Sequence, residues 1–203
     1  LVGNIANPAT TIVDGTANGT IFYLKKEASN DYIKGFTIRN AGNSFNAIYV
    51  ENDAPTVDNI QITNNIITTS QYGIYFSNSC RNTVFNNTFI NNPFGGIYLY
   101  DADNTNITRN IITDSAYGIR ATHSVNTTIV NNTITQTSYA IHLTSASTGS
   151  TIQGNTISGQ NVGVYSSSDT NIILRNTISG GAYGIYLYNS RTSTINYTTI
   201  KGS

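Results

Sequence analysis

Residues 87–108 read NTFINNPFGGIYLYDADNTNIT, and this stretch decides the fold. Apolar and polar side chains alternate with period two in three pieces of it, at 87–90, 96–100 and 106–108, as they do in half-buried β-strands. Asn, Asp and Gly residues, which favour turns, lie between the pieces. Three short strands in about 22 residues predict one coil of a parallel β-helix, in which each strand pairs with its counterpart in the coils above and below.

The same pattern recurs along most of the chain. The first marker is the Asn of an Asn-Thr-Ile-like triplet, which returns every 21 to 23 residues at Asn65, Asn87, Asn110, Asn132, Asn155 and Asn176. The second is a small residue followed by an aliphatic one, found at Ala47, Gly73, Gly96, Gly118, Ala140, Gly163 and Gly184. One interval of the second series is 26 residues, because of an insertion between Glu51 and Asn59. Two independent markers with one period indicate a solenoid.

We therefore expect an all-β, right-handed, single-stranded parallel β-helix of about eight coils of 21–23 residues, with three short strands per coil. It forms a single domain over residues 1–203. A leucine-rich repeat has a similar period, but it needs Leu at fixed positions and a helical segment that this chain lacks. No amphipathic helix or polar cap is evident at either end of the sequence. Since solenoid ends need covering, we expect a piece of a longer chain or end-to-end contacts with neighbouring domains or subunits.

Stacking the coils also predicts the interior. Four columns of mainly β-branched residues should face inward, beginning at Ile38, Ile48, Val50 and Ile62. At one turn the Asn series should form a ladder of buried side-chain amides, in which each amide donates to the next coil. We interpret this ladder as structural.

Composition narrows the function. Ten Lys and Arg balance ten Asp and Glu, and charged residues are only 10% of the chain, which argues against a nucleic-acid partner. No apolar run reaches the roughly 18 to 20 residues of a membrane span. The single cysteine, Cys80, excludes an internal disulfide and a Cys-based zinc site. The composition points to no cofactor.

One outward column is rich in tyrosine. If the aliphatic residue after each small marker points inward, the next residue points outward, and Tyr100 lies on the same face two positions beyond Tyr98. Rings with polar edges suit the apolar face and hydroxyls of a sugar chain. The alternative is that outward Tyr only reflects high β propensity and mutual support of neighbouring rings. The candidate ligand-binding residues are Tyr49, Tyr75, Tyr98, Tyr100, Arg120, His142, Tyr165 and Tyr186.

Catalysis on this face would need converging carboxyls. A glycoside hydrolase uses two, about 5 to 10 Å apart, and a polysaccharide lyase would want a calcium-binding acidic cluster and a base. The candidate groups are Glu51, Asp53, Asp101, Asp103, Arg120 and His142. The two acidic pairs should lie about 9 to 10 Å apart, and acids at turns are also expected for local reasons. We expect no metal at His142, because the other histidine, His123, should lie on a different face.

Several sequence stretches carry a family resemblance. Residues 72–79 (YGIYFSNS), 131–134 (NNTI), 11–15 (TIVDG) and 35–40 (GFTIRN) resemble the right-handed β-helix domains called carbohydrate-binding and sugar-hydrolase domains. They are similar to the β-helix of the periplasmic copper-processing family of nitrous oxide reductase maturation, and to archaeal and bacterial surface proteins. The resemblance covers nearly the whole chain from about Thr11. It implies the fold, with roles that range from polysaccharide lyase or glycosidase to noncatalytic scaffold.

These observations lead to an extracellular or cell-surface scaffold, or a periplasmic one, that binds neutral or calcium-bridged polysaccharide on its tyrosine face. The alternative is a lyase or glycoside hydrolase that uses the acidic residues of that face. N-glycosylation is a further expectation if the chain is exported where that modification occurs. The Asn-x-Ser/Thr sequons are at Asn18, Asn86, Asn106, Asn126, Asn131 and Asn196.

Overall fold

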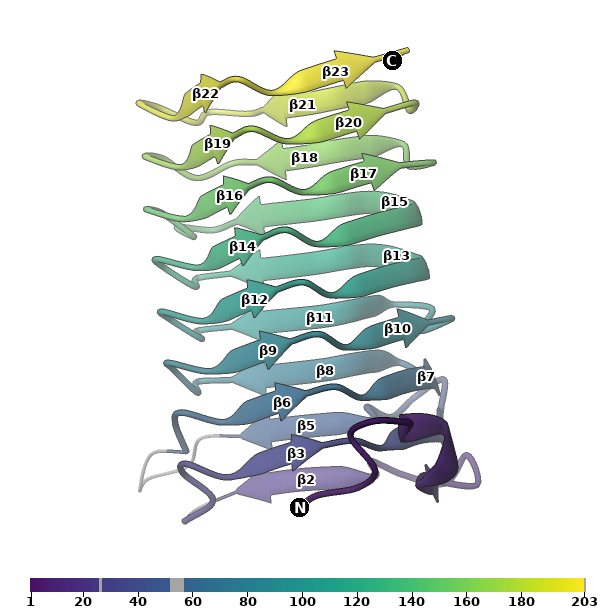
Figure 1. The fold of residues 1–203 in the computed structure, drawn as a ribbon. Helices are drawn as coiled ribbons and strands as arrows, with labels where there is room; N and C mark the ends of the chain where they lie inside the picture. Colours follow the sequence, from purple (N-terminus) through teal and green to yellow (C-terminus); the bar gives the residue numbers. More distant parts are fainter. Residues whose placement is uncertain (26, 52–56, 203) are drawn as a thin grey trace.

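A computed structural model describes residues 1–25, 27–51 and 57–202. The chain winds into a solenoid with three walls, in which every strand pairs in parallel with its equivalents in the neighbouring coils (Figure 1). The strands of the near side run to the right, those of the far side return to the left, and the chain rises with each coil, so the β-helix is right-handed (Figure 1). The predicted fold class is confirmed.

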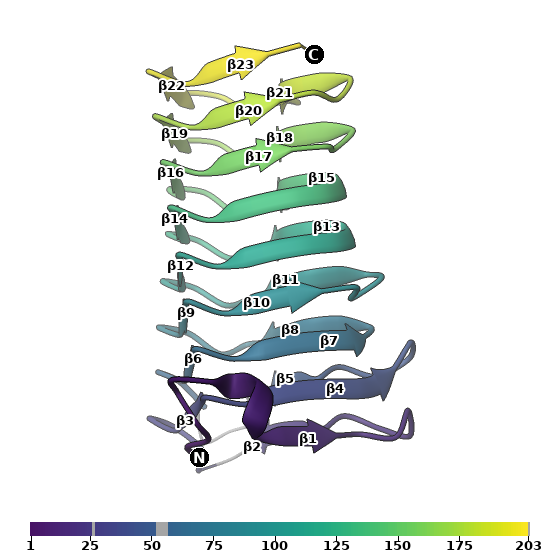
Figure 2. The same ribbon diagram turned by 45° about the vertical axis from the view of Figure 1, so that its right-hand side comes forward.

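The first wall contains strands that open each coil. They are β1 (Ile12–Asp14), β4 (Thr37–Gly42), β7 (Ile66–Ser70), β10 (Thr88–Ile90), β17 (Thr156–Ser158), β20 (Thr177–Ser179) and β23 (Thr199–Lys201). The short helix η1 (Pro8–Thr10) lies outside this wall beside β4, where the Thr37 hydroxyl donates to the Pro8 carbonyl at 3.1 Å (Figure 2).

The second wall follows, and the third closes each coil. The second comprises β2 (Phe22–Lys25), β5 (Ile48–Glu51), β8 (Tyr72–Ser77), β11 (Gly95–Tyr100), β18 (Val162–Ser166) and β21 (Tyr183–Leu187). The third is an eight-stranded sheet of β3 (Tyr32–Lys34), β6 (Gln61–Thr63), β9 (Thr83–Phe85), β12 (Asn106–Thr108), β14 (Thr128–Val130), β16 (Thr151–Gln153), β19 (Ile172–Leu174) and β22 (Thr194–Asn196).

Two coils depart from the expected three short strands. Strands β13 (Ile111–Thr122) and β15 (Thr133–Thr144) are each 12 residues long and run through both the first and the second wall. Only one residue of each, Asp114 and Gln136, takes up the bend with a positive φ, and pairing continues beyond it at Ser115 and Thr137. The two walls are therefore one continuous sheet at these coils.

The core follows the predicted columns. Ile67, Phe89 and Ile112 lie in register and are fully buried, as are Ile74 and Ile97 in the next column. In the last coil Ile195 and Ile200 remain 48% and 44% exposed, since no described coil covers them. Apart from that end, the interior is a continuous apolar stack.

Small residues at the start of the second wall allow the coils to approach closely. A Cβ atom on Gly96 would lie 2.7 Å from Cγ2 of Ile112 and 2.9 Å from the carbonyl oxygen of Gly118. Side chain and backbone would both have to move, so this position favours Gly. The periodic small marker in the sequence thus reflects packing.

The asparagine ladder is confirmed. The Oδ1 atom of Asn155 accepts the backbone N–H of Asn132 at 2.9 Å and its side-chain N–H at 3.0 Å. The same double acceptance links each neighbouring pair from Asn65 to Asn176, and these side chains are at most 1% exposed. The ladder satisfies buried polar groups at the turn between the third and first walls.

A second buried polar ladder runs along the turn between the second and third walls. Backbone N–H groups of Ala102, Ser124 and Ser147 donate to the hydroxyls of Ser124, Ser147 and Ser168 in the following coil, at 3.0 to 3.3 Å. A sequence signal for this ladder was present, because serine recurs with the period of the repeat at Ser79, Ser124, Ser147, Ser168 and Ser190, with Ala102 in between.

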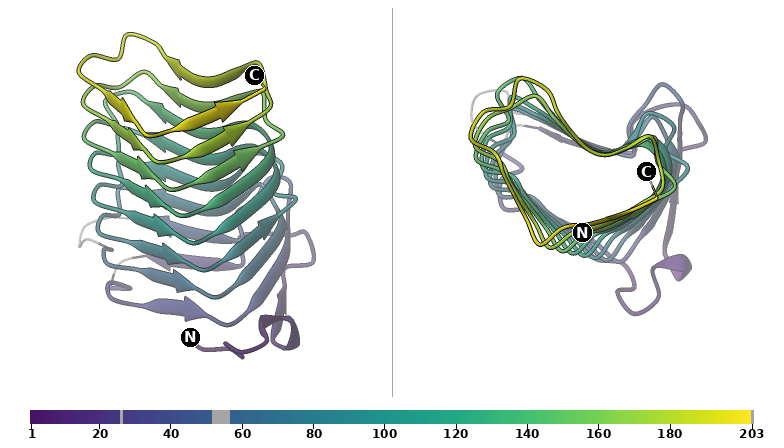
Figure 3. Two further views of the ribbon diagram at one scale, coloured as in Figure 1. Left: turned by 45° about the horizontal axis from the view of Figure 1, so that its top comes forward. Right: turned by 90° about the horizontal axis from the view of Figure 1, so that it is seen from above.

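The second wall is not flat. Seen along the axis, its backbone bows inward between its two ends (Figure 3). The tyrosine column lies on the outer side of this wall.

Candidate functional site

The outward residues of the second wall form the predicted column in exact parallel register. From the first coil to the last they are Tyr23, Tyr49, Tyr75, Tyr98, Arg120, His142, Tyr165 and Tyr186. Ring centroids are separated by 5.2 Å for Tyr23–Tyr49, 5.1 Å for Tyr49–Tyr75 and 4.7 Å for Tyr75–Tyr98. The spacing of about 5 Å expected from strand pairing is therefore observed, and Tyr23 extends the column by one coil.

A second set of aromatic residues widens this column. Tyr72 lies 5.2 Å from Tyr98 between ring centroids, and Tyr117 lies 5.5 Å from Tyr139. The additional residues are Tyr72, Phe94, Tyr117, Tyr139 and Tyr183. We call the two sets together the aromatic wall.

Period-two alternation could not find this second set. Gly118 and Ile119 are both buried although they are consecutive, so Tyr117 faces the same side as Arg120 instead of the interior. The strand bends at its small residue, and the inside-outside pattern shifts by one position there. A usable signal was present, because a tyrosine directly precedes the small marker in four coils, at Tyr72, Tyr117, Tyr139 and Tyr183.

The tyrosines are packed against one another, and apart from Tyr72, which is 8% exposed, they remain accessible. Tyr23 and Tyr186 at the ends of the column are 52% and 40% exposed, whereas Tyr75 and Tyr98 are half-buried. Burial, with a smaller contribution from neighbouring tyrosines, raises the pKa of Tyr75 to about 12. Its hydroxyl is therefore neutral at physiological pH and keeps its capacity to donate and accept hydrogen bonds.

Arg120 and His142 interrupt the rings in the middle of the wall. The guanidinium carbon of Arg120 lies 4.9 Å from the ring centroid of Tyr98 and 5.1 Å from that of Tyr117. The His142 ring stacks on Tyr165 at 4.7 Å. Burial, and secondly the Arg120 charge, lowers the pKa of His142 to about 4, so this imidazole is neutral at pH 7.

The candidate carboxylates serve local structure. Glu51 accepts hydrogen bonds from the hydroxyls of Tyr23 and Tyr49 and lies 3.3 Å from Lys25 Nζ. Asp103 accepts the backbone N–H of Val125 at 2.8 Å. This capping arrangement recurs where Asp58 accepts the backbone N–H of Cys80 at 2.8 Å.

The remaining acids add no catalytic pair to the described part of the chain. Asp101 is a turn residue with a φ of 49°, and Asp53 lies outside the described residues. Among the described residues, no three His, Cys, Asp or Glu side chains gather into a potential metal site.

His123 lies nearer the aromatic wall than the register indicates. Its ring packs edge-on against Tyr100, with 5.8 Å between centroids. His123 lies just after the end of β13, with a φ of 53°.

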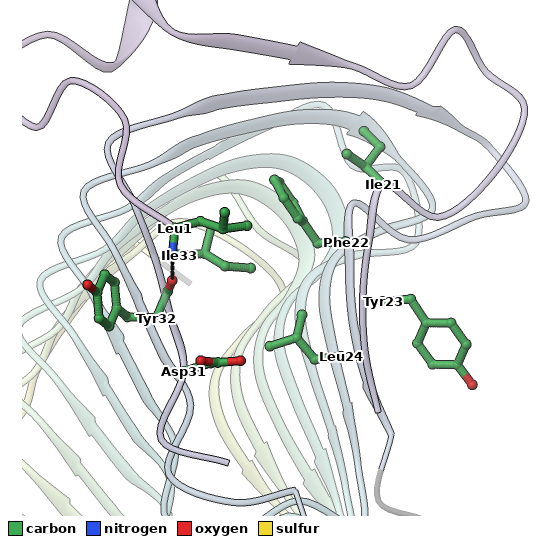
Figure 4. A pocket seen from close by; sticks show the side chains of 8 residues that line it. All are labelled: Leu1, Ile21, Phe22, Tyr23, Leu24, Asp31, Tyr32 and Ile33. Carbon is green, nitrogen blue, oxygen red and sulfur yellow. Dashed lines mark hydrogen bonds between the residues drawn. The ribbon is translucent and has the colours of Figure 1, made fainter. Parts of the chain in front are cut away.

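The first coil contains a cavity of about 520 Å³. Ile21, Phe22, Leu24 and Ile33 line it, and Leu1 lies beside them, where its amino group donates to the Tyr32 carbonyl at 2.7 Å (Figure 4). Tyr23 points away from this apolar group (Figure 4). The cavity lies at the start of the solenoid core, and Tyr23 is the residue that it shares with the column of outward rings.

Comparison with protein-family models decides the family. The model of the periplasmic copper-binding protein NosD matches residues 6–166 and again residues 143–203. The chain belongs to the NosD family. The resemblance noted in the sequence is confirmed, and the periplasmic assignment of the family agrees with the expected location outside the cytoplasm.

Solved structures similar to this NosD-family chain share only its fold. The A-module of mannuronan C-5 epimerase AlgE6 from Azotobacter vinelandii is 14% identical, with a TM-score of 0.49, over 93% of this chain and 57% of its own. The catalytic domain of a GH87 α-1,3-glucanase in complex with nigerose is 12% identical, with a TM-score of 0.44, over 97% of this chain and 56% of its own. The chain thus spans a little over half the length of these structures. No curated protein matches.

The family description raises the question of copper. Copper sites use Cys, Met and His side chains. The chain has no Met, one Cys and two His, and no three His, Cys, Asp or Glu side chains gather into a potential metal site in the described part. Burial raises the pKa of the Cys80 thiol, which disfavours the thiolate that binds metal. The described residues therefore do not fit a copper site.

The structure also bears on the sequons and on membrane-spanning helices. All six sequon asparagines are exposed. No helix in the described residues is long and apolar enough to cross a membrane.

Proposed function

We propose that this NosD-family β-helix is a periplasmic or cell-surface scaffold that binds an extended polysaccharide along its aromatic wall. The observation that carries the proposal is the unbroken run of rings from Tyr23 to Tyr98, spaced 4.7 to 5.2 Å apart on the outer side of a wall whose backbone bows inward. The ligand-binding residues are Tyr49, Tyr75, Tyr98, Tyr100, Arg120, His142, Tyr165 and Tyr186.

The arrangement suits a polymer better than a single sugar. Each ring offers one apolar face and one hydroxyl, so a single contact contributes modestly and affinity must accumulate over several coils. The register aligns equivalent rings along the solenoid axis, which gives a chain of sugars a repeated set of contacts.

Packing of rings for stability alone is the competing explanation. The exposure of Phe94 argues against it as the whole account, because this ring lies in the middle of the stack and is still 50% exposed. Rings placed only to cover the sheet would gain by burying this surface.

The test compares wild type with the double variant Tyr75→Ala/Tyr98→Ala by affinity electrophoresis in gels that contain polysaccharide, with and without calcium. Wild type should be retarded by at least one polysaccharide and the double variant clearly less. Tyr32→Ala, on the third wall, is the matched control, since Tyr32 is 43% exposed but lies outside the aromatic wall. Equal mobility of wild type and the double variant in every gel would leave the rings as structure only.

A further inference from the structure

Arg120 is the one positively charged residue in the column of outward rings, and the Tyr72 side chain is a polar neighbour of it. No carboxylate lies within ion-pair distance of its guanidinium in the described part of the chain. Its Nε atom is buried and has no hydrogen-bond partner. A partly buried cation normally acquires a counterion, because its lost hydration is otherwise compensated only in part.

The rings around Arg120 compensate for some of this cost and also fix its position. Tyr98 and Tyr117 hold the guanidinium by cation–π contacts of 4.9 and 5.1 Å. The side chain is half-buried, so it is still accessible from the outer surface. A guanidinium is planar, and its two terminal nitrogens offer a pair of N–H donors that matches the two oxygens of a carboxylate.

The neighbouring residue in the next coil also has a buried nitrogen atom without a hydrogen-bond partner. His142 is in register with Arg120, and its Nδ1 atom is likewise buried without a partner. Rings of Tyr117, Tyr139 and Tyr165 surround the imidazole at 4.7 to 5.1 Å. Two adjacent coils thus place nitrogen atoms without partners at one point of the aromatic wall.

One negative charge of this face is paired with a cation, and a second is fixed at a turn. Glu51 is engaged with Lys25 and two tyrosine hydroxyls, and Asp103 is held at the turn by the backbone N–H of Val125. The sequence-based expectation of a neutral or calcium-bridged glycan rested on repulsion from such residues.

We propose that Arg120 forms a carboxylate subsite, so that the polysaccharide on the aromatic wall contains uronic acid residues. This inference rests on the proposed function, because it takes the aromatic wall as the glycan-binding surface. The carboxylate of one sugar unit would pair with the Arg120 guanidinium, while adjoining units stack on the tyrosines of the coils on either side.

The experiment uses two forms of one polymer, polygalacturonate and its methyl ester, which lacks the charge. Binding is measured for wild type, Arg120→Gln, Arg120→Lys and Tyr75→Ala/Tyr98→Ala. Wild type should prefer the acid form, and Arg120→Gln should lose at least about tenfold in affinity for that form while keeping its affinity for the ester. Arg120→Lys, which keeps the charge without the planar fork, should be intermediate.

The outcomes separate the two claims. If wild type binds both forms equally, or if Arg120→Gln weakens both equally, the carboxylate subsite is wrong while the aromatic wall stands. If neither form binds, the carboxylate subsite fails, and the gels that contain other polysaccharides decide the proposed function. If the double tyrosine variant binds both forms like wild type, the proposed function and the subsite both fail. Should Arg120→Gln not fold, the comparison of wild type with Arg120→Lys on the two forms decides in the same way.

Discussion

Asn132 donates its backbone N–H and its side-chain N–H to a single atom of Asn155, at 2.9 and 3.0 Å. The other side-chain proton of Asn132 reaches the carbonyl of Ile107 at 2.9 Å. Each asparagine of the ladder therefore joins its own coil to both neighbours, and all of these groups are buried. The ladder couples the coils without forming a reactive site.

Replacing Asn132 by Ala should destabilise the protein by about 1 to 3 kcal/mol, because the buried amides of Asn110 and Asn155 lose partners. Chemical denaturation measures the change. Asn106→Ala is the matched control, since Asn106 is exposed and should cost little. Equal denaturation midpoints for the two variants would contradict a stabilising role of the ladder at Asn132.

Replacing Gly96 by Val should also destabilise the protein, by about 1 to 3 kcal/mol. The new side chain would meet Ile112 at 2.7 Å and the Gly118 carbonyl at 2.9 Å. In Gly19→Val, by contrast, the added Cβ meets nothing within 4 Å, so this variant should unfold close to wild type. The relevant quantity is the difference between the two thermal midpoints, and no difference would contradict close packing at the small-residue column.

His142 should make stability depend on pH. Its pKa is lowered from 6.5 to about 4 in the folded protein. Between these two pH values the imidazole is therefore largely protonated in the unfolded chain and largely neutral in the folded one. The free energy of unfolding should therefore fall as the pH drops from 6.5 to about 4, and the contribution is intact above 6.5.

His142→Gln isolates this effect. The difference in unfolding free energy between the variant and wild type should be constant above pH 6.5 and should shift in favour of the variant between pH 6.5 and about 4. Parallel curves across that range would mean that His142 titrates normally. His123→Gln serves as control, because its side chain is exposed.

The repeat predicted most of the fold because stacking makes one position obey the same rule in every coil. Asn87 and Asn110, or Ile97 and Ile119, occupy equivalent environments, so a single coil and the period give the register. The sequence fails where that rule changes locally. Tyr117 faces outward because its strand bends at Gly118, and β13 bends at Asp114 without ending.

The candidate site could be predicted only in part. The column from Tyr49 to Tyr186 follows from alternation, and the structure reproduces its register. The role of Asp103 depends on which backbone N–H its carboxylate reaches in the next coil. The cation–π contacts of Arg120 depend on Tyr117, whose side chain is predicted by alternation to point inward. Such contacts arise from three-dimensional neighbours whose side-chain directions the sequence pattern does not give.

The most direct test of the aromatic wall is an NMR titration of tyrosine ring signals with oligosaccharides of each polysaccharide that the affinity gels contain. The ring signals of Tyr75 and Tyr98 should shift and saturate together, because these rings lie 4.7 Å apart on the proposed surface. Tyr32 and Tyr197 lie outside the aromatic wall and are 43% and 74% exposed, and the chemical shifts of their ring signals should not change. Saturable shifts at Tyr32 or Tyr197 with none at Tyr75 and Tyr98, or no shift at any ring, would contradict binding at the aromatic wall.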